Sequence, residues 1–347
     1  MNRSTLGALL ALTAAVAVAP ALILPAQAED EHHFEYERQK WSFAGMSGAY
    51  DKAQLQRGFQ VYQQVCSNCH SLSRIYWRNL VESGGPEFPE AAVKQLAAKW
   101  PNRPLEESDS GETVASKDGK TSDGLTVKKG ELLTRAPLLS DPILGPYRNV
   151  KEAKAAQNGA LPPNLSVIAK ARDIHNEGFW VIHIGKMAAD VFNGYQEGGP
   201  DYIYNLLLNY REHVPAYKRD ANGKLVAVEE RAVTDEKAVE RCVTIATEPG
   251  KPDKCNALNE GLNYNVAFPG NQIAMVPPIS KENFVSYQDG TGSLEENARD
   301  VAAFLEWAAD PKLNQRKAMG WQVMLYLLIT SVLLYVGKQR IWANVKH

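Results

Sequence analysis

Residues 66–70 read Cys-Ser-Asn-Cys-His, and no other segment limits the possible folds of this chain as strongly. Two thiols at this spacing on one helical turn can each add to a vinyl group of a haem, and the histidine that follows then lies beneath the iron. The 347 residues include only four cysteines and seven histidines, so chance rarely produces the motif. We therefore predict a c-type haem domain, in which Cys66 and Cys69 carry one covalent haem c and His70 binds its iron.

Two other kinds of site also use a Cys-x-x-Cys pair. A zinc site would need two further ligands at finger-like spacing, but the remaining cysteines, Cys242 and Cys255, lie far along the chain. A thioredoxin-type redox pair would follow a strand and needs no histidine after its second cysteine. Haem attachment explains all three motif residues and both alternatives leave at least one unexplained.

The second face of such an iron is either open, as in a haem enzyme or gas sensor, or closed by another ligand for electron transfer. Methionine is the usual closing ligand, and Met46, Met187 and Met275 are the ones outside the apolar ends of the chain. We favour Met275 because two prolines follow it closely and can fix an extended loop that holds the sulfur. Met187 is the main alternative, and a second histidine is a further one: His175, His183 or His213.

The first 28 residues have the layout of a secretory signal peptide. One charged residue, Arg3, precedes an apolar run to Leu24, and residues 26–28 form a small-x-small site. The segment has no twin arginine and is not arginine-rich, which argues against a Tat signal and a mitochondrial transit peptide. An uncleaved membrane anchor is the alternative. We predict that the chain from residue 29 onward is exported.

Residues 318–337 form a stretch of 20 residues without a charged side chain. As a helix this stretch would be about 30 Å long, the thickness of the hydrocarbon core of a bilayer. Trp321 and Tyr335 lie near its ends, as interfacial aromatic residues do. Basic but no acidic residues follow, which favours a cytoplasmic tail at residues 338–347. We predict a transmembrane anchor at 318–337, with a buried core helix as the alternative.

The part between the apolar ends, residues 29–310, is acidic. It contains all 40 acidic residues of the chain and 31 of its 38 basic residues, which gives a net charge of −9. This balance excludes a strongly basic nucleic-acid-binding protein. A negative field would speed encounter with a basic partner, although solubility alone also explains the charge.

Apolar periodicity predicts a mainly helical domain. Helices are expected at residues 52–66, 150–158, 202–210 and 294–309. Asp51 is the expected N-cap of the first helix, and Asp310-Pro311 is expected to end the last. Strand signals are short, at 225–228 and 242–246, and the polar stretch 104–129 is expected to be an exposed loop.

Cys242 and Cys255 would meet an oxidising compartment in an exported protein. A disulfide between them would close a short loop and add about 3 kcal/mol by the loop-entropy relation. Two free thiols are the alternative.

Several segments, in the same order along the chain, resemble the cytochrome c1 family. They are residues 65–72 around the haem motif, 158–166, 198–204, 268–278 with Met275, 287–291, and the helix near 304–307 that leads to the anchor. The similarity covers most of the exported chain. The chain departs from the family pattern at two insertions, 104–129 and 172–197, although Arg172 resembles a family arginine near a haem propionate.

The resemblance implies a class I cytochrome c-like haem domain with loop insertions and one C-terminal transmembrane helix. It implies the electron-transfer subunit of a quinol–cytochrome c oxidoreductase, the cytochrome bc1 complex. The complex as a whole would oxidise quinol, while this subunit would break no substrate bond. Such a subunit receives electrons from the Rieske iron-sulfur protein, passes them to a soluble or membrane-bound cytochrome c, and associates with cytochrome b.

The resemblance also assigns residues and a place. His70 and Met275 would be the two axial ligands, and the segment Pro162-Pro163 would accept a hydrogen bond from His70. The protein would lie in a bacterial inner membrane, with residues 29–310 in the periplasm. An autonomous or oxidase-associated membrane-anchored monohaem cytochrome c is the alternative.

Overall fold

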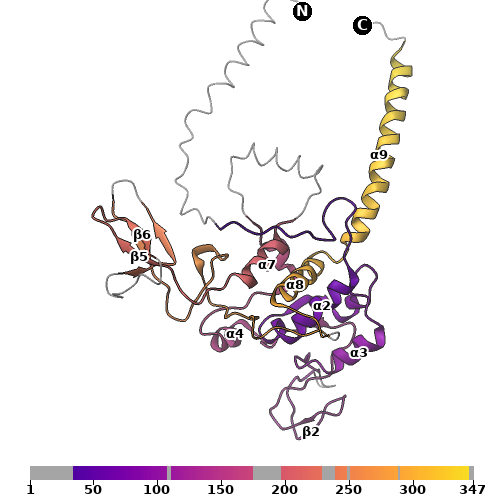
Figure 1. Cartoon of the computed structure of the whole chain (residues 1–347). Helices are drawn as coiled ribbons and strands as arrows, with labels where there is room; N and C mark the ends of the chain where they lie inside the picture. Colours follow the sequence, from indigo (N-terminus) through magenta and orange to yellow (C-terminus); the bar gives the residue numbers. More distant parts are fainter. Residues whose placement is uncertain are drawn as a thin grey trace, which may run out of the picture. The chain divides into compact units, whose positions relative to one another are not determined.

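The computed structural model describes residues 34–107, 111–174, 197–228, 239–247, 251–287 and 290–343. The described residues from Glu35 onward belong to one unit, whose helices and strands are labelled in Figure 1. The predicted signal peptide lies outside the described residues, as do three candidate ligands: Met187, His175 and His183.

Helix α2 (Lys52–Gln64) leads directly into the haem motif. The carboxylate of Asp51 accepts hydrogen bonds from the backbone N–H groups of Ala53 and Gln54, at 2.9 and 3.3 Å. These bonds satisfy two donors that a helix N-terminus leaves open, which confirms the predicted N-cap. The α-helix ends two residues earlier than predicted because the chain tightens into a 3₁₀ turn, η2 (Cys66–Asn68).

Helix α8 (Leu294–Ala309) has the predicted bounds. The hydroxyl of Ser293 accepts a hydrogen bond from the backbone N–H of Glu296 at 3.1 Å, so the helix has a serine cap. Its last carbonyls are taken by the backbone N–H of Asp310, and Pro311 follows. Most of its side chains from residue 297 onward are buried, so α8 runs through the core.

Helices α2 and α8 cross at Gly58. A Cβ atom added at this glycine would lie 2.1 Å from the carbonyl oxygen of Asp300 and 2.6 Å from the Cβ of Phe304, so only glycine allows the two backbones to approach this closely. Phe59 packs edge-on against Phe304, with ring centroids 5.6 Å apart. Both rings are almost completely buried, so this crossing is the centre of the main core.

The other helices pack around this pair. Helices α7 (Gly199–Leu208) and α5 (Ile168–Ala171) both contact α8. The structure confirms the helices predicted near 202–210 and 150–158, with shifted bounds, the second being α4 (Val150–Ala156). Helix α3 (Glu90–Ala98) was not predicted from the sequence.

The end of α8 carries a buried carboxyl group, that of Glu306. Burial raises the pKa of this carboxyl to about 7, although Lys170 of α5 lies 3.3 Å away and opposes the shift. Lys170 also pairs with Glu197 and, at 3.8 Å, with Asp310, which in turn pairs with Arg316. One oxygen of Glu306, Oε2, is buried without a hydrogen-bond partner among the described residues. The carboxyl of Glu306 is therefore protonated at a higher pH than an exposed glutamate is.

Short antiparallel strands accompany the helices, which the sequence indicated only in part. Strand β6 (Leu225–Val228) has the predicted bounds and joins a three-stranded sheet in the order β6-β5-β7. The predicted strand at 242–246 is shorter, β8 (Thr244–Ala246). In the three-stranded sheet, β5 is Ala216–Arg219 and β7 is Glu240–Arg241. The remaining strands form four pairs: β1 (Leu72–Tyr76) with β4 (Pro142–Ile143), β2 (Gly119–Lys120) with β3 (Thr126–Val127), β8 with β9 (Lys254–Asn256), and β10 (Asn263–Tyr264) with β11 (Gln272–Ile273). The stretch 104–129, expected to be a plain loop, contains the β2–β3 pair.

Helix α9 (Leu313–Trp342) contains the whole uncharged stretch 318–337. Among the described residues it is the one helix long and apolar enough to cross a membrane, with a mean hydropathy of 1.7. None of this apolar window is buried within the protein, so the structure contradicts the alternative of a buried core helix. Its first turn packs on the domain, because Leu313 belongs to the main core.

Candidate functional site

The haem motif lies on a single turn at the end of α2. The backbone N–H groups of Cys69 and His70 both donate to the carbonyl oxygen of Cys66, at 3.1 and 2.8 Å. Ser67 and Asn68 donate through their side chains to the carbonyls of the last turn of α2. These bonds close the end of the helix and hold the two thiols and the imidazole on one short turn, as the spacing predicted.

Cys66 and Cys69 are free, partly buried thiols in this structure. Burial raises the pKa of the Cys66 thiol to about 12. A reactive redox pair needs a thiolate of lowered pKa, so this environment does not favour the thioredoxin-type alternative. Gln157, from the turn after α4, donates to the sulfur of Cys69 at 3.7 Å and to the hydroxyl of Tyr147 at 2.6 Å. The sequence held no signal for these two neighbours.

His70 is oriented by the chain segment that follows α4. Its Nδ1 donates to the carbonyl oxygen of Pro163 at 2.8 Å, which confirms the predicted bond to the Pro162-Pro163 segment. This bond fixes the tautomer in which Nε2 carries the lone pair that a metal needs. Burial lowers the pKa of His70, which favours the neutral imidazole. The backbone N–H of Leu165 donates to the carbonyl oxygen of Ser71 at 2.9 Å, so the two segments run side by side.

Met275 lies on a separate loop whose backbone is firmly held. The loop follows the β10–β11 hairpin, whose turn contains Gly270 with a positive φ of 76°. The carbonyl oxygen of Met275 accepts hydrogen bonds from the hydroxyl of Tyr210 at 3.1 Å and from Nδ2 of Asn263 at 3.3 Å. Neither residue was found by sequence reasoning, because an isolated tyrosine or asparagine far along the chain carries no signal.

The other described candidates have different surroundings. Met46 lies in a loop that is hydrogen-bonded to Lys317 at the start of α9, and its side chain is largely exposed. His213 is exposed. Arg172 ends the short helix α5.

The donor set matches the chemistry of a c-type haem. The thiols of Cys66 and Cys69 and an imidazole with an available Nε2 share one turn, and a thioether lies on a loop whose backbone is held by two side chains. Thiols supply the covalent links, and imidazole and thioether are the usual axial pair of an electron-transfer haem. The residues present therefore fit this cofactor.

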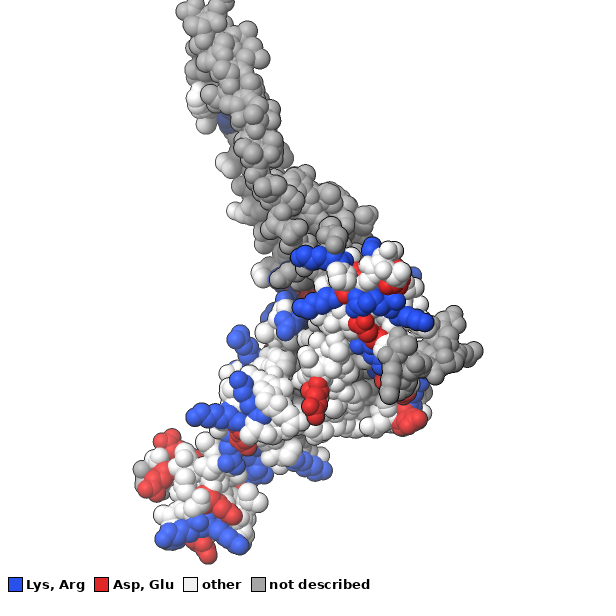
Figure 2. Space-filling view, turned by 90° about the vertical axis from the view of Figure 1, so that its left-hand side faces the viewer, with Lys and Arg blue, Asp and Glu red and all other residues white. Residues whose placement is uncertain are grey.

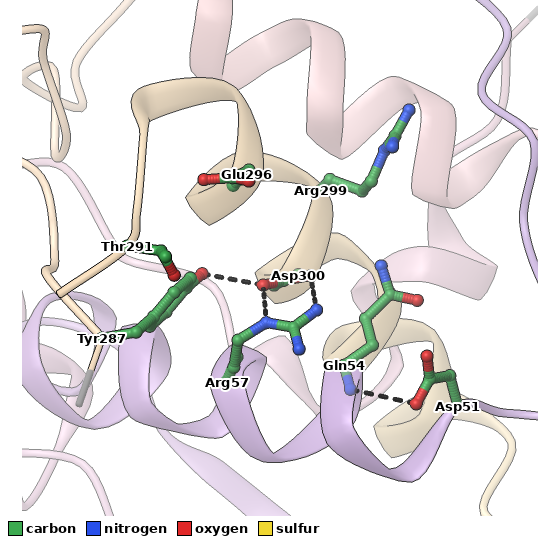
Figure 3. Close-up of a pocket in the computed structure, with 8 residues that line it drawn as sticks. All are labelled: Asp51, Gln54, Arg57, Tyr287, Thr291, Glu296, Arg299 and Asp300. Atoms are coloured by element: carbon green, nitrogen blue, oxygen red, sulfur yellow. Dashed lines mark hydrogen bonds and ion pairs between the residues drawn. The ribbon is translucent and has the colours of Figure 1, made fainter. Parts of the chain in front are cut away.

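Figure 3 shows a pocket of another kind, between α2 and the start of α8. Its lining is charged: Arg57 bonds both oxygens of Asp300, at 2.7 and 3.2 Å, and the hydroxyl of Tyr287 donates to the same carboxylate at 2.8 Å. Arg57 also lies over the ring of Tyr287. Arg57 of α2 and Asp300 of α8 neutralise each other's charge, and this ion pair joins the two helices.

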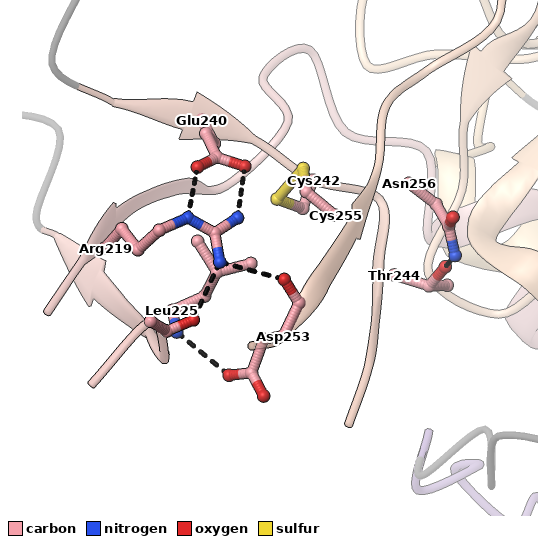
Figure 4. The surroundings of a disulfide bond; sticks show 9 residues. Arg219, Leu225, Glu240, Cys242, Thr244, Asp253, Cys255 and Asn256 are labelled. Atoms are coloured by element: carbon pink, nitrogen blue, oxygen red, sulfur yellow. Dashed lines mark hydrogen bonds and ion pairs between the residues drawn. A yellow bond between two sulfur atoms is a disulfide. The ribbon is translucent and has the colours of Figure 1, made fainter. Parts of the chain in front are cut away.

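The predicted disulfide between Cys242 and Cys255 is present (Figure 4). Cys255 lies in β9 and Cys242 two residues before β8. Val243, between Cys242 and β8, belongs to a small separate cluster of buried residues with Val214 and Tyr264, and its backbone N–H donates to the carbonyl oxygen of Asn256 in β9 at 2.8 Å. Arg219 braces this region by pairing with Glu240 at 2.9 Å and donating to the carbonyl oxygens of Gly223 and Asp253. Because both sulfurs are joined, they are not metal ligands, although Glu240 lies close to them.

The disulfide region is connected to the methionine loop. Nδ2 of Asn271, in the turn of the β10–β11 hairpin, donates to the carbonyl oxygen of Val243 at 2.7 Å. Asn271 has a positive φ of 56°, a conformation that asparagine tolerates better than most residues. The bond ties the hairpin that precedes Met275 to the residue next to Cys242.

Charged side chains on the visible surface are mixed rather than segregated. On the face shown in Figure 2, lysine and arginine side chains are interspersed with acidic ones. This face therefore provides no uniformly negative surface, despite the net charge of −9 of residues 29–310.

Comparison with known proteins gives a consistent result. A model of the Cytochrome C1 family matches residues 41–128 and 125–345. Cytochrome c1 of Blastochloris viridis is 37% identical over 329 residues, 94% of this chain and 92% of that protein. Cytochrome c1 of Rhodospirillum rubrum is 34% identical over 311 residues, 89% of this chain and 88% of that protein.

A third relative is a longer protein. Cytochrome b/c1 of Bradyrhizobium diazoefficiens is 34% identical over 307 residues, which cover 88% of this chain but 35% of that protein. The family match and these similarities each extend over most of the sequence, and the span of the family match includes residues 66–70 and Met275. The chain belongs to the cytochrome c1 family.

Proposed function

We propose that this protein is the haem-bearing electron-transfer subunit of a cytochrome bc1 complex. The observation that carries the proposal is the Cys66-x-x-Cys69-His70 turn, whose imidazole is fixed by the carbonyl of Pro163, in a chain of the cytochrome c1 family. The bound haem c supplies reversible one-electron chemistry of its iron. The subunit itself breaks no substrate bond, so its residues serve to hold, orient and tune the cofactor.

Each site residue has a physical task in this proposal. Cys66 and Cys69 would hold the haem through thioether links on the turn after α2. His70 would offer Nε2 to the iron, and the bond from its Nδ1 to the carbonyl oxygen of Pro163 would raise the basicity of the imidazole. Met275 would offer its thioether to the same iron, which would raise the reduction potential. The two hydrogen bonds to its carbonyl oxygen keep its backbone in place.

The same proposal covers the arrangement of the chain. Residues 1–28 are a signal peptide, 29–310 the periplasmic haem domain, 318–337 the transmembrane anchor and 338–347 a cytoplasmic tail. The exposed apolar surface of α9 supports the anchor. The helical core of α2, α7 and α8 beside the haem turn supports a class I cytochrome c-like fold with insertions. The protein then spans a bacterial inner membrane once.

The partners follow from the assigned place in the complex. Cytochrome b is one, which the name of the relative cytochrome b/c1 supports. The Rieske protein delivers single electrons, and a soluble or membrane-bound cytochrome c receives them.

A ligand-substitution experiment tests the assigned haem site. In the Met275→Leu variant of the purified complex, we expect the reduction potential of the haem to fall sharply, because the thioether that stabilises the reduced iron is lost. The Met46→Leu variant is the matched control and should keep the potential of the wild type. An unchanged potential in Met275→Leu would show that another residue is the second axial ligand.

Copurification tests the partner assignment. A mild detergent extract should yield this chain together with a cytochrome b and a Rieske protein. If the chain is isolated with its haem but without both partners, it is an autonomous or oxidase-associated cytochrome.

A further inference from the structure

Residues 41–50 form a loop without a charged side chain, in a protein in which 22% of residues are charged. Both ends of the loop are fixed. The indole N–H of Trp41 donates to Oδ1 of the buried Asp201 at 2.8 Å, and the hydroxyl of Tyr50 donates to the carbonyl oxygen of Asp310 at 3.2 Å. The loop is therefore a defined element that is held at both ends.

The loop buries its aromatic rings and exposes its tip. Trp41 and Phe43 are both 5% exposed, and their rings stack with centroids 5.4 Å apart. Met46 is 52% exposed, and Ser47 beside it is also exposed. Met46 is thus an exposed apolar side chain at the tip of an uncharged loop.

Lys317 holds this tip against α9. Its ammonium group donates to the carbonyl oxygens of Phe43 and Gly45, both at 2.6 Å, and to that of Gly48 at 3.3 Å. An ammonium has three N–H donors, so the three carbonyl oxygens of the loop accept all the hydrogen bonds that Lys317 can donate. Lys317 is also the last residue before the uncharged stretch 318–337.

The position of this contact along α9 gives the depth of the loop. Each helical residue rises about 1.5 Å, so Lys317 lies about one such step from the first residue of the apolar span. Helical side chains tilt toward the N-terminus, which places the ammonium on the domain side of that boundary. The interfacial layer of a bilayer is roughly 5–8 Å thick on each side. Met46 lies between the bonded residues Gly45 and Gly48 and therefore at the level of this layer.

A second loop contacts α9 closer to the domain and is charged. Glu82 pairs with Lys312 at 2.8 Å, and the carbonyl oxygen of Gly84 accepts a hydrogen bond from Asn314 at 3.4 Å. Asn314 is three residues before Lys317, about 4.5 Å further from the apolar span. The 41–50 loop begins its contact with α9 at this same residue, because the backbone N–H of Tyr50 donates to Oδ1 of Asn314 at 3.2 Å. The charged loop thus contacts only the first residues of α9, and the part of the 41–50 loop that reaches Lys317 is uncharged, which is the change expected toward a membrane surface.

We propose that the tip of the 41–50 loop, formed by Met46 and Ser47, enters the lipid interface beside α9 and is a second membrane contact of this protein. The proposal rests on the proposed anchor at 318–337. A methionine gains free energy when its apolar surface leaves water, and its flexible side chain adapts to a disordered boundary. Attachment at two points restricts the tilt and rotation of the haem domain above the bilayer, which one helix alone does not.

Photo-crosslinking in the intact complex, in its native membrane, tests the proposal. A thiol-reactive benzophenone is attached in the variants Met46→Cys and Ser47→Cys. Two matched controls carry the same label: Leu328→Cys in α9, where the side chain is 63% exposed, and Val226→Cys in β6, where it is 55% exposed. The native cysteines do not compete, because two are joined by the disulfide and two carry the haem.

We expect lipid adducts by mass spectrometry at positions 46, 47 and 328, and none at 226. A peptide adduct from another subunit at positions 46 and 47, or the absence of any lipid adduct there, would overturn the inference. If position 328 still labels lipid in that case, the membrane anchor is unaffected. Absence of lipid adducts at 328 would overturn the membrane anchor and the inference with it.

Discussion

Removing the disulfide should destabilise one region of the protein and leave the rest unchanged. The bond joins Cys242 and Cys255, which are 13 positions apart. The loop-entropy relation gives about 3 kcal/mol for a loop of this length, which corresponds to roughly a 10²-fold change in a local opening equilibrium. The double variant Cys242→Ala/Cys255→Ala is the appropriate change, because a single substitution leaves an unpaired thiol.

The structure says where the effect should appear. Val243, next to Cys242, belongs to the small cluster of Val214, Val243 and Tyr264, which is separate from the main core at the crossing of α2 and α8. A small cluster contributes little burial energy, so the crosslink is a large part of its stability. We expect backbone amides of β8 and β9 to exchange hydrogen about 10²-fold faster, with α2 and α8 unchanged.

Hydrogen exchange with mass spectrometry measures this directly. The Thr244→Val variant is the matched control, since it removes only the side-chain bond between Thr244 and Asn256, at 2.9 Å in the same strand pair. Its loss should cost about 1 kcal/mol and accelerate exchange by less than the double variant does. Unchanged exchange in β8 and β9 of the double variant, or equal acceleration in α8, would refute the reasoning.

Three further changes have defined outcomes. Arg57→Ala leaves the nearly buried carboxylate of Asp300 without its cation and should lower the free energy of unfolding by about 2–3 kcal/mol in a denaturant titration. The loss is smaller than for a fully buried pair because Arg57 is itself partly exposed. A loss below about 0.5 kcal/mol would contradict this. Burial raises the pKa of Glu306 from 4.5 to about 7, so the folded state binds more protons than the unfolded state between these pH values. The free energy of unfolding should therefore fall as the pH rises from about 4.5 to about 7, and Glu306→Gln should remove this fall. If the variant and the wild type show parallel pH profiles, Glu306 is not the source. Tyr210→Phe removes one of the two hydrogen bonds to the carbonyl oxygen of Met275 and should lower the stability of the methionine loop by about 1 kcal/mol. Methionine ligation should then be lost at a lower denaturant concentration than in the wild type. An unchanged concentration would show that the bond from Asn263 suffices.

Features that depend on residues close together in the sequence could be predicted. The thiols and imidazole at 66–70 share a turn because their spacing alone brings them together. Helix α8 has the predicted bounds because its serine cap, its apolar period and Asp310-Pro311 all act locally. The uncharged stretch lies within one helix for the same reason, since length and composition suffice to define it.

Tertiary structure decided what distant residues do to one another. The carbonyl that orients His70 lies 93 positions away, and the tyrosine that holds Met275 lies 65 positions away. The three carbonyls bound by Lys317 are about 270 positions distant from it. Such pairs leave no periodicity or motif, because a hydrogen bond needs only one donor and one acceptor wherever the fold brings them together. The sequence by itself therefore determined which groups can hold a haem, and the folded chain determined how those groups are oriented and how the domain is joined to its helix.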